Sequence, residues 1–134
     1  METLLDIKDL SIDATISNKT YNIIKDVSIK VKKGETVAIV GESGSGKTIT
    51  SLSILRLLEK NLSIKKGKII FEGKNILELN EDEMRKIRGK EISFIFQEPL
   101  TALNPVVNIE TQITEVLTHH KICDQKTASK KAKE

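Results

Sequence analysis

The chain has 134 residues, of which 38% are hydrophobic, 31% charged and 3% aromatic. This length fits one small domain or part of a larger one, and the composition is typical of a soluble globular fold. The formal net charge is only +3, and its basic excess lies largely in Lys126, Lys130, Lys131 and Lys133. No aromatic side chains are interleaved with these lysines to stack on bases, so we interpret them as a solvated helix face and expect no nucleic acid as partner.

The apolar runs of the sequence and its N-terminus bear on where the chain works. Runs such as 37–40 are far too short to cross a bilayer. Residues 1–6 lack the basic and apolar regions of a signal peptide. The single cysteine, Cys123, excludes an internal disulfide and agrees with a reducing compartment. We therefore expect a cytoplasmic chain, which can still dock on a membrane partner.

The first third of the chain predicts strands. Segment 5–12 alternates apolar and polar residues imperfectly, and segment 23–31 resumes the pattern after a loop at 18–20. Both are typical of strands with one buried face, and together they predict an antiparallel pair at the edge of a sheet. After a turn at 33–35, segment 36–40 is continuously apolar, which predicts a strand buried on both faces of a largely parallel sheet.

The rest of the chain alternates predicted helices and strands. Apolar spacing predicts a helix over 47–60, and glycines bracket a short strand over 68–71. Asn80 is a plausible N-cap for a helix that runs to about Arg88 and ends at Gly89. Beyond these lie a second apolar strand over 92–96, a helix over 109–120 and a polar, helix-prone stretch over 125–134.

One glycine-rich loop between a predicted strand and a predicted helix matches the phosphate-binding pattern G-x-x-x-x-G-K-[ST] at every fixed position. Glycines let the backbone turn sharply and approach a ligand, and the start of the helix adds positive character there. The lysine would reach the β- and γ-phosphates, and the hydroxyl after it would bind Mg²⁺. The alternative, a plain glycine-rich turn, gives no reason for a lysine and a hydroxyl at the helix start. The loop comprises Gly41, Glu42, Ser43, Gly44, Ser45, Gly46, Lys47 and Thr48.

Gln97 follows the predicted strand 92–96 directly. Ligands of open α/β sheets bind at the carboxyl ends of the strands, and a neutral amide there can contact Mg²⁺ or a water. The alternative is a surface glutamine that starts a loop. His119 and His120 lie on a predicted helix, and we interpret them as exposed helix residues rather than catalytic ones.

Two stretches resemble the ATPases of ABC transporters: 33–48, which resembles the Walker A region, and 92–105, which resembles the Q-loop of the oligopeptide and dipeptide importer branch. Nickel importers are close relatives in that branch. The resemblance implies an α/β fold: a P-loop NTPase core with N-terminal antiparallel strands over 1–100, and the start of a helical subdomain over 101–134. It also implies that the chain binds ATP and Mg²⁺, with Gln97 linking the γ-phosphate to the helical subdomain.

The resemblance further implies partners and a role. The chain would belong to the ATP-binding subunit that energises peptide import, lying on the inner face of the cell membrane against permease subunits and a second ATPase subunit. The family stacks adenine on an aromatic residue upstream of Walker A; Tyr21 is the only tyrosine, and it either serves there or packs on the antiparallel sheet.

The departures from the family pattern limit the expected activity. The sequence has no Leu-Ser-Gly-Gly-Gln signature, no Walker B strand ending in Asp with a catalytic Glu after it, and no switch His. We expect a truncated domain that binds Mg-ATP but hardly hydrolyses it alone. Two alternatives stay open: a non-transport ABC-type ATPase, and a non-catalytic fragment that self-associates through uncovered strand edges and apolar faces.

Overall fold

A computed structural model describes residues 2–98 and 102–133 of the chain. Two compact units, Met1–Asn80 and Glu81–Glu134, make up the chain, and each is described by itself. The boundary predicted between residues 100 and 101 falls outside the described residues and stays a prediction. Among the described residues, no helix has both the length and the apolar character that crossing a bilayer requires.

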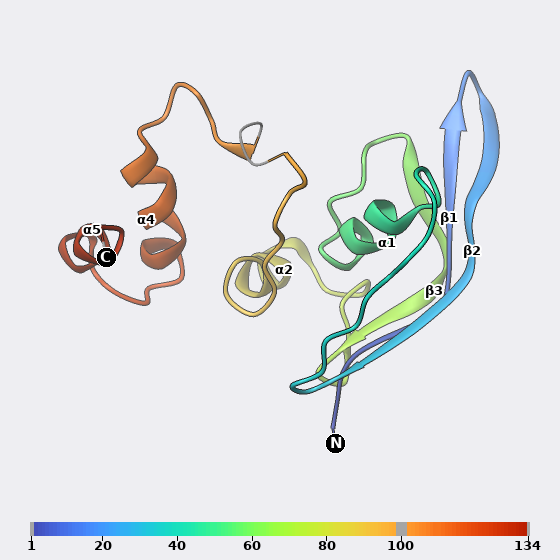
Figure 1. Cartoon of the computed structure of the whole chain (residues 1–134), viewed down its shortest axis with the longest axis horizontal. Helices are drawn as coiled ribbons and strands as arrows, with labels where there is room; N and C mark the ends of the chain where they lie inside the picture. Colours follow the sequence, from blue (N-terminus) through green and yellow to red (C-terminus); the bar gives the residue numbers. More distant parts are fainter. Residues whose placement is uncertain (1, 99–101, 134) are drawn as a thin grey trace. The chain divides into compact units, whose positions relative to one another are not determined.

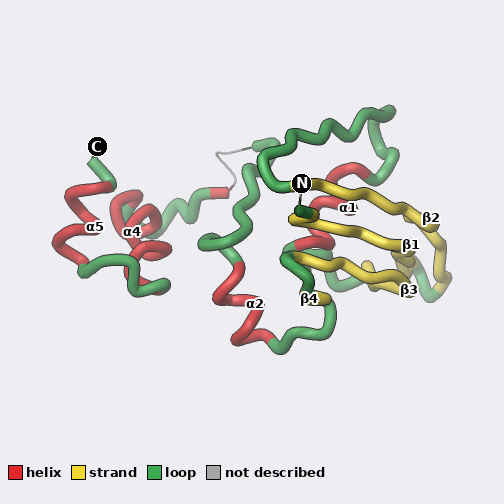
Figure 2. Tube along the Cα trace, turned by 90° about the horizontal axis from the view of Figure 1, so that it is seen from below, coloured by secondary structure: helices red, strands yellow, loops and turns green. Residues whose placement is uncertain are grey.

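The first unit is built on a four-stranded antiparallel sheet. Its strands are β1 (Thr3–Ile16), β2 (Lys19–Lys32), β3 (Leu62–Phe71) and β4 (Lys74–Asn75), in the order β2-β1-β3-β4. Figures 1 and 2 show β1 between its two long neighbours, with α1 (Lys47–Ile54) beside the sheet. The predicted antiparallel pair is confirmed, and the strand predicted over 68–71 begins earlier, at Leu62.

Bulges in the sheet explain why the alternation along the sequence is imperfect. Ile7 and Leu10 are both buried although they are three residues apart, because the pairing of β1 with β2 shifts register between them. Asp9 lies at this shift with a φ of 48°, and its N–H donates to Ser28 Oγ at 2.9 Å. Asp26 on β2 has the same φ of 48°. Polar residues therefore occupy the bulges while the apolar residues stay on the core side.

The helix α1 is shorter than the sequence predicts. It ends at Ile54 rather than near Lys60, because Arg56 has a φ of 55° that no helix accommodates. The guanidinium of Arg56 donates to the carbonyl of Leu79 at 2.6 Å and so ties this turn to a later loop. Thr50 and Ser53 are the buried residues of the helix. Small polar side chains thus contribute to the inner face of this helix.

The prediction of a strand over 36–40, in a largely parallel sheet, and of a second apolar strand over 92–96 is wrong for the described residues: neither segment forms a strand. Val40 and Ile95 are each 92% exposed. A parallel strand needs neighbouring strands to pair its N–H and C=O groups. The sheet described above is antiparallel throughout and pairs with neither segment. The apolar run predicts the local preference correctly, but pairing depends on other parts of a sheet.

The second unit is helical, with α2 (Glu81–Ile87), α4 (Ile109–His119) and α5 (Gln125–Lys131). The helices predicted after Asn80 and over 109–120 are confirmed, and the helix-prone stretch that begins at residue 125 forms α5. Gly89, with a φ of 78°, follows α2 as a helix-ending glycine should. The Asn108 side chain accepts from the N–H of Glu110 at 2.8 Å and caps α4.

The last two helices pack on one another through small residues. Thr114 of α4 and Ala128 of α5 are almost fully buried, and the Gln125 amide donates to Thr114 Oγ1 at 3.3 Å. The side chain of Asp124 accepts from the N–H of Thr127 at 2.9 Å and caps α5. This unit therefore rests on helix caps and small contacts rather than on a large apolar core.

Candidate functional site

The loop 41–48 links the extended segment 36–40 to α1 in the first unit (Figure 1). Gly44 and Gly46 have φ values of 78° and 89°, which a residue with a side chain rarely adopts. The N–H of Ser45 donates to the carbonyl of Glu42 at 3.2 Å and closes a tight turn between them. The backbone thus takes the curved shape that the glycine pattern predicts.

Gly46 is the N-cap of α1, and two features leave the start of this helix open to an anion. Among the described residues no side chain accepts from its first amides, and its first turn holds no acidic residue. The first amides of a helix have no partner within the helix, and they carry partial positive charge. Negative groups bind well at such a place. The N-terminus of α1 therefore suits a phosphate.

Gly46 is also held against the sheet. A Cβ built on it would lie 2.2 Å from Cδ1 of Ile24, a buried residue of β2. Nothing in the glycine pattern points to Ile24, because the contact joins residues that lie far apart in the chain. The sequence therefore predicts the loop but misses the residue on which the loop rests.

Lys47 points back into its own loop. Its ammonium donates to the carbonyl oxygens of Gly41 at 2.8 Å and Glu42 at 2.7 Å, and lies 3.3 Å from Ser45 Oγ. A cation is thereby held beside the open N-terminus of α1. Because the carbonyl partners are neutral, oxygens of a bound phosphate would be stronger acceptors for the same ammonium. The residues present fit a phosphate-bearing ligand.

The structure places the two predicted Mg²⁺ ligands in different units. Thr48 is an exposed residue in the first turn of α1. Gln97 is exposed in the second unit, after the extended segment 92–96. Both residues are exposed, and the binding of one Mg²⁺ by the Thr48 hydroxyl and the Gln97 amide stays a prediction.

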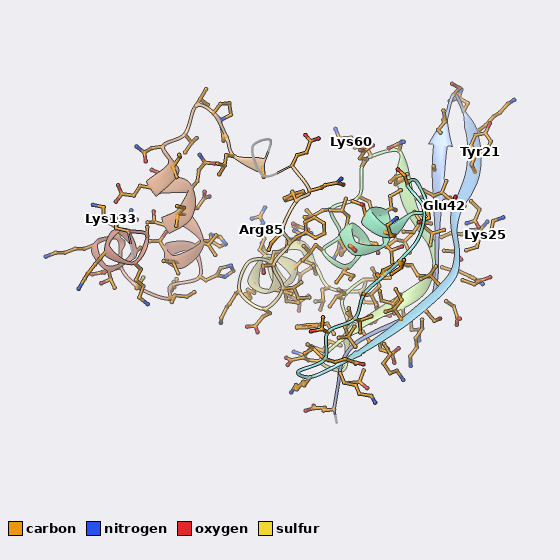
Figure 3. All side chains as sticks on the ribbon, in the orientation of Figure 1. Tyr21, Lys25, Glu42, Lys60, Arg85 and Lys133 are labelled. Atoms are coloured by element: carbon orange, nitrogen blue, oxygen red, sulfur yellow. The ribbon has the colours of Figure 1, made fainter. Side chains whose placement is uncertain are left out.

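Tyr21 lies on β2 near the tip of the β1–β2 hairpin, paired with Ala14 on β1. Its side chain is 49% exposed and points away from the sheet in Figure 3. It is not packed into the core, so the ring has a free face. Stacking of adenine on this ring stays a prediction.

The two histidines differ in their surroundings. His119 is exposed, as expected, whereas His120 is half-buried. The Nε2 of His120 lies 2.9 Å from the carbonyl oxygen of Arg88. Because a carbonyl oxygen only accepts, this nitrogen carries the proton. His120 therefore fixes the turn after α2 to the end of α4, a role that the sequence does not indicate.

Comparison with known proteins places this loop and fold in a family. The sequence model of the ABC transporter family matches residues 24–134. The oligopeptide transport ATP-binding protein OppD of Bacillus subtilis is 46% identical over 132 residues, which cover 98% of this chain and 37% of that protein. The dipeptide transport ATP-binding protein DppD of Lactococcus lactis is 43% identical over 134 residues, covering 99% of this chain and 38% of that protein. The chain thus spans well under half the length of these relatives.

Solved structures agree on the fold. The dimeric structure of MJ0796, a bacterial ABC transporter cassette, superposes with a TM-score of 0.81 at 24% identity and covers 96% of this chain and 54% of that one. A post-hydrolysis state of the same cassette bound to ADP and Pi gives a TM-score of 0.78 at 23% identity. At this identity the likeness shows the fold alone, and the α/β P-loop fold class predicted from the sequence is confirmed.

Proposed function

The chain belongs to the ABC transporter family, and we propose that it binds Mg-ATP through the loop 41–48 as part of the ATP-binding subunit of a peptide importer. One observation carries this proposal. The Lys47 ammonium lies inside a loop whose glycines 44 and 46 have left-handed backbone conformations, beside the N-terminus of α1, where no described side chain caps the helix. A cation and free amides in one place provide two of the features that phosphate recognition uses.

On binding, the donors of the loop would exchange partners. The Lys47 ammonium would leave the carbonyls of Gly41 and Glu42 for phosphate oxygens, and the amides of residues 44–48 would donate to the phosphates. Thr48, and Gln97 from the second unit, would hold Mg²⁺, which supplies charge neutralisation at the phosphates. Tyr21 offers an exposed ring for the adenine. Affinity for the base rests on that ring, since phosphate contacts alone discriminate poorly among nucleotides.

Hydrolysis needs more than this loop provides. Phosphoryl transfer depends on a positioned water and on neutralising charge as it develops, and the sequence matches neither the Walker B aspartate nor the glutamate that follows it in the family. We expect negligible turnover by the chain alone. Appreciable ATP hydrolysis that disappears in Lys47→Ala would contradict this part of the proposal.

The relatives guide the proposal on partners. OppD and DppD are named as oligopeptide and dipeptide transport ATP-binding proteins. By analogy, the chain would work at the cytoplasmic face of the membrane with permease subunits and a second ATPase subunit. Peptides are the favoured cargo, and nickel is the alternative within the same branch.

A second candidate function is self-association without catalysis. Val40 and Ile95 are each 92% exposed on unpaired extended segments, and Val106 is 89% exposed. Unpaired apolar segments of this kind invite pairing with another chain. Exchange of the C-terminal helices between copies is a further route to the same outcome. Light scattering tests this candidate, and a monodisperse monomer at high concentration would count against it.

The nucleotide proposal is tested by calorimetric titration of the whole chain with Mg²⁺ and a non-hydrolysable ATP analogue. Wild type is compared with Lys47→Ala and with a control of equal charge change, Lys60→Ala, which removes an exposed lysine between α1 and β3. A saturable binding phase that survives in the control and is lost in Lys47→Ala supports the proposal, whether or not weaker binding at another site remains. Binding that is unchanged in Lys47→Ala would exclude the loop as the site. Tyr21→Leu should weaken binding of the analogue and leave binding of pyrophosphate unchanged.

A further inference from the structure

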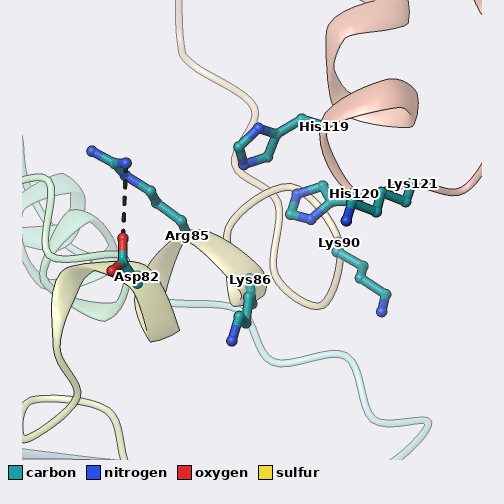
Figure 4. A pocket seen from close by; sticks show the side chains of 7 residues that line it. All are labelled: Asp82, Arg85, Lys86, Lys90, His119, His120 and Lys121. Carbon is teal, nitrogen blue, oxygen red and sulfur yellow. Dashed lines mark ion pairs between the residues drawn. The ribbon is translucent and has the colours of Figure 1, made fainter.

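A cavity in the second unit is lined almost entirely by basic side chains. Its volume is about 530 Å³, within the usual range for small-molecule sites. Four of the lining residues are lysines or arginine, and they come from α2, from the turn after it and from the second residue after the end of α4 (Figure 4). They are Arg85, Lys86, Lys90 and Lys121.

The negative charge present in the pocket does not balance these cations. Asp82 is the one carboxylate among the described lining residues, and it lies 3.9 Å from the Arg85 guanidinium. Lys90 pairs outside the pocket lining, with Glu91 at 3.8 Å. Lys86 and Lys121 form no ion pair with any described residue. A concave surface lined by one sign of charge concentrates ions of the opposite sign.

The two histidines complete the lining of the pocket. The rings of His119 and His120 lie edge to face, with centroids 5.2 Å apart. The Nε2–H of His120 donates to the Arg88 carbonyl, and the Nδ1 of this tautomer is an acceptor, so the donors for an anion are the arginine and the lysines. No apolar side chain is among the described lining residues. The charges of the pocket therefore favour an anion with several oxygen acceptors.

We propose that this pocket binds a phosphate-bearing anion, at a site separate from the loop 41–48. Lysine ammonium groups bind phosphate as point charges from several directions, which suits cations presented by three different segments. The shared chemistry is a phosphate group with two or more negative charges. Two sources carry it: a soluble phosphate compound, and the headgroup of an anionic lipid. The proposal does not depend on nucleotide binding by the first unit.

The first test uses inorganic pyrophosphate without Mg²⁺, titrated calorimetrically into the whole chain carrying Lys47→Ala. This background removes the lysine of the first-unit loop, so that remaining binding reports the pocket. Lys86→Gln with Lys121→Gln should weaken binding about tenfold or more, since two charge-assisted contacts are lost. The matched control, Lys126→Gln with Lys130→Gln, removes the same charge from exposed positions of α5 and should change binding less than about twofold, the screened effect of distant charges.

A second measurement does not depend on how the pocket variants fold. In the Lys47→Ala parent, pyrophosphate should shift the imidazole resonances of His119 and His120 along a saturable curve. Absence of saturable binding would overturn the proposal. Equal weakening by the pocket pair and the control pair would also overturn it, since that would indicate general charge attraction. Imidazole resonances that do not move while binding occurs would place the anion elsewhere and overturn it as well.

Vesicles separate the two sources of phosphate. Phosphatidylcholine vesicles with and without phosphatidic acid are floated with the same variants. Binding that requires phosphatidic acid, is lost in the Lys86 and Lys121 pair and is competed by pyrophosphate assigns the pocket to a lipid headgroup. Saturable pyrophosphate binding with no flotation assigns it to soluble phosphate compounds. If the chain binds neither the vesicles nor pyrophosphate, the proposal is overturned.

Discussion

Replacing Gly46 with alanine tests how the phosphate-binding loop is held against the sheet. Two costs arise from the structure. The φ of 89° at Gly46 costs a residue with a Cβ about 1–2 kcal/mol. The new Cβ would also meet Ile24 Cδ1 at 2.2 Å. Ile24 is only 4% exposed, so its side chain has little room to move, and overpacking of this kind costs about 1–3 kcal/mol. We expect a loss of stability of about 2–5 kcal/mol in total.

Two matched variants separate these costs. At Gly44 the φ is 78° and no atom lies within 4 Å of an added Cβ, so Gly44→Ala should show the backbone cost alone, about 1–2 kcal/mol. Ile24→Val removes Cδ1 and leaves Cγ1, which is 3.6 Å from the added Cβ, an ordinary contact. By itself this change should cost about 0.5–1.5 kcal/mol. Combined with Gly46→Ala, Ile24→Val should relieve the clash, so that the two changes together cost less than the sum of their separate costs by about 1–3 kcal/mol.

Urea unfolding at 25 °C provides the measurement. The chain has one tyrosine and no tryptophan, and because Tyr21 lies on β2, its fluorescence reports the first unit. The reasoning is refuted if Gly46→Ala costs no more than Gly44→Ala, or if the two changes at positions 24 and 46 add without coupling.

Three further outcomes are expected. Gly67→Ala should destabilise the sheet by about 3 kcal/mol or more, because an added Cβ would lie 2.7–2.8 Å from backbone atoms of β1, whereas Gly73→Ala, with nothing within 4 Å, should cost far less; urea midpoints that coincide would contradict this. Lys66 donates to Asp26 at 2.6 Å and holds the pKa of that carboxyl below 3.8 while its own pKa lies above 10.5, so the pair should stabilise the fold between these values and lose its effect as pH falls through the lowered pKa of Asp26 or rises through the raised pKa of Lys66. In Lys66→Gln the carboxyl should titrate closer to 3.8 by NMR, and an unchanged midpoint would refute the pairing. Asn108→Ala removes the cap of α4 and should cost about 1 kcal/mol, seen as faster amide exchange in the first turn of α4.

Local patterns in the sequence predict most of the elements. Asn80 and Gly89 give the approximate ends of α2, and alternation gives the β1–β2 hairpin. The bulge at Asp9 is visible as a broken alternation, although the sequence alone does not show that Ser28 accepts its N–H contact across the sheet. The curved backbone of the loop 41–48 is predicted from its glycines, because the pattern is contained in eight consecutive residues, and the role of the loop at a phosphate stays a prediction.

Features that depend on distant parts of the chain escape prediction. The apolar segments 36–40 and 92–96 favour strands locally, yet a strand forms only where another strand pairs with it. The contact between Ile24 and Gly46 joins β2 to the start of α1 and has no sequence signal. The basic pocket is formed by residues from two helices and a turn of the second unit. In the sequence, each of its lysines is indistinguishable from an ordinary surface lysine.

The central claim is that the loop 41–48 of this chain holds the phosphates of a nucleotide. The most direct measurement is an amide NMR titration of the whole chain with Mg²⁺ and a non-hydrolysable ATP analogue, in wild type and in Lys47→Ala. We predict that the amide resonances of Gly44, Gly46 and Thr48 shift along one saturable curve in wild type and stay in place in the variant. A folded wild-type chain whose loop amides do not move at saturating nucleotide would contradict the claim.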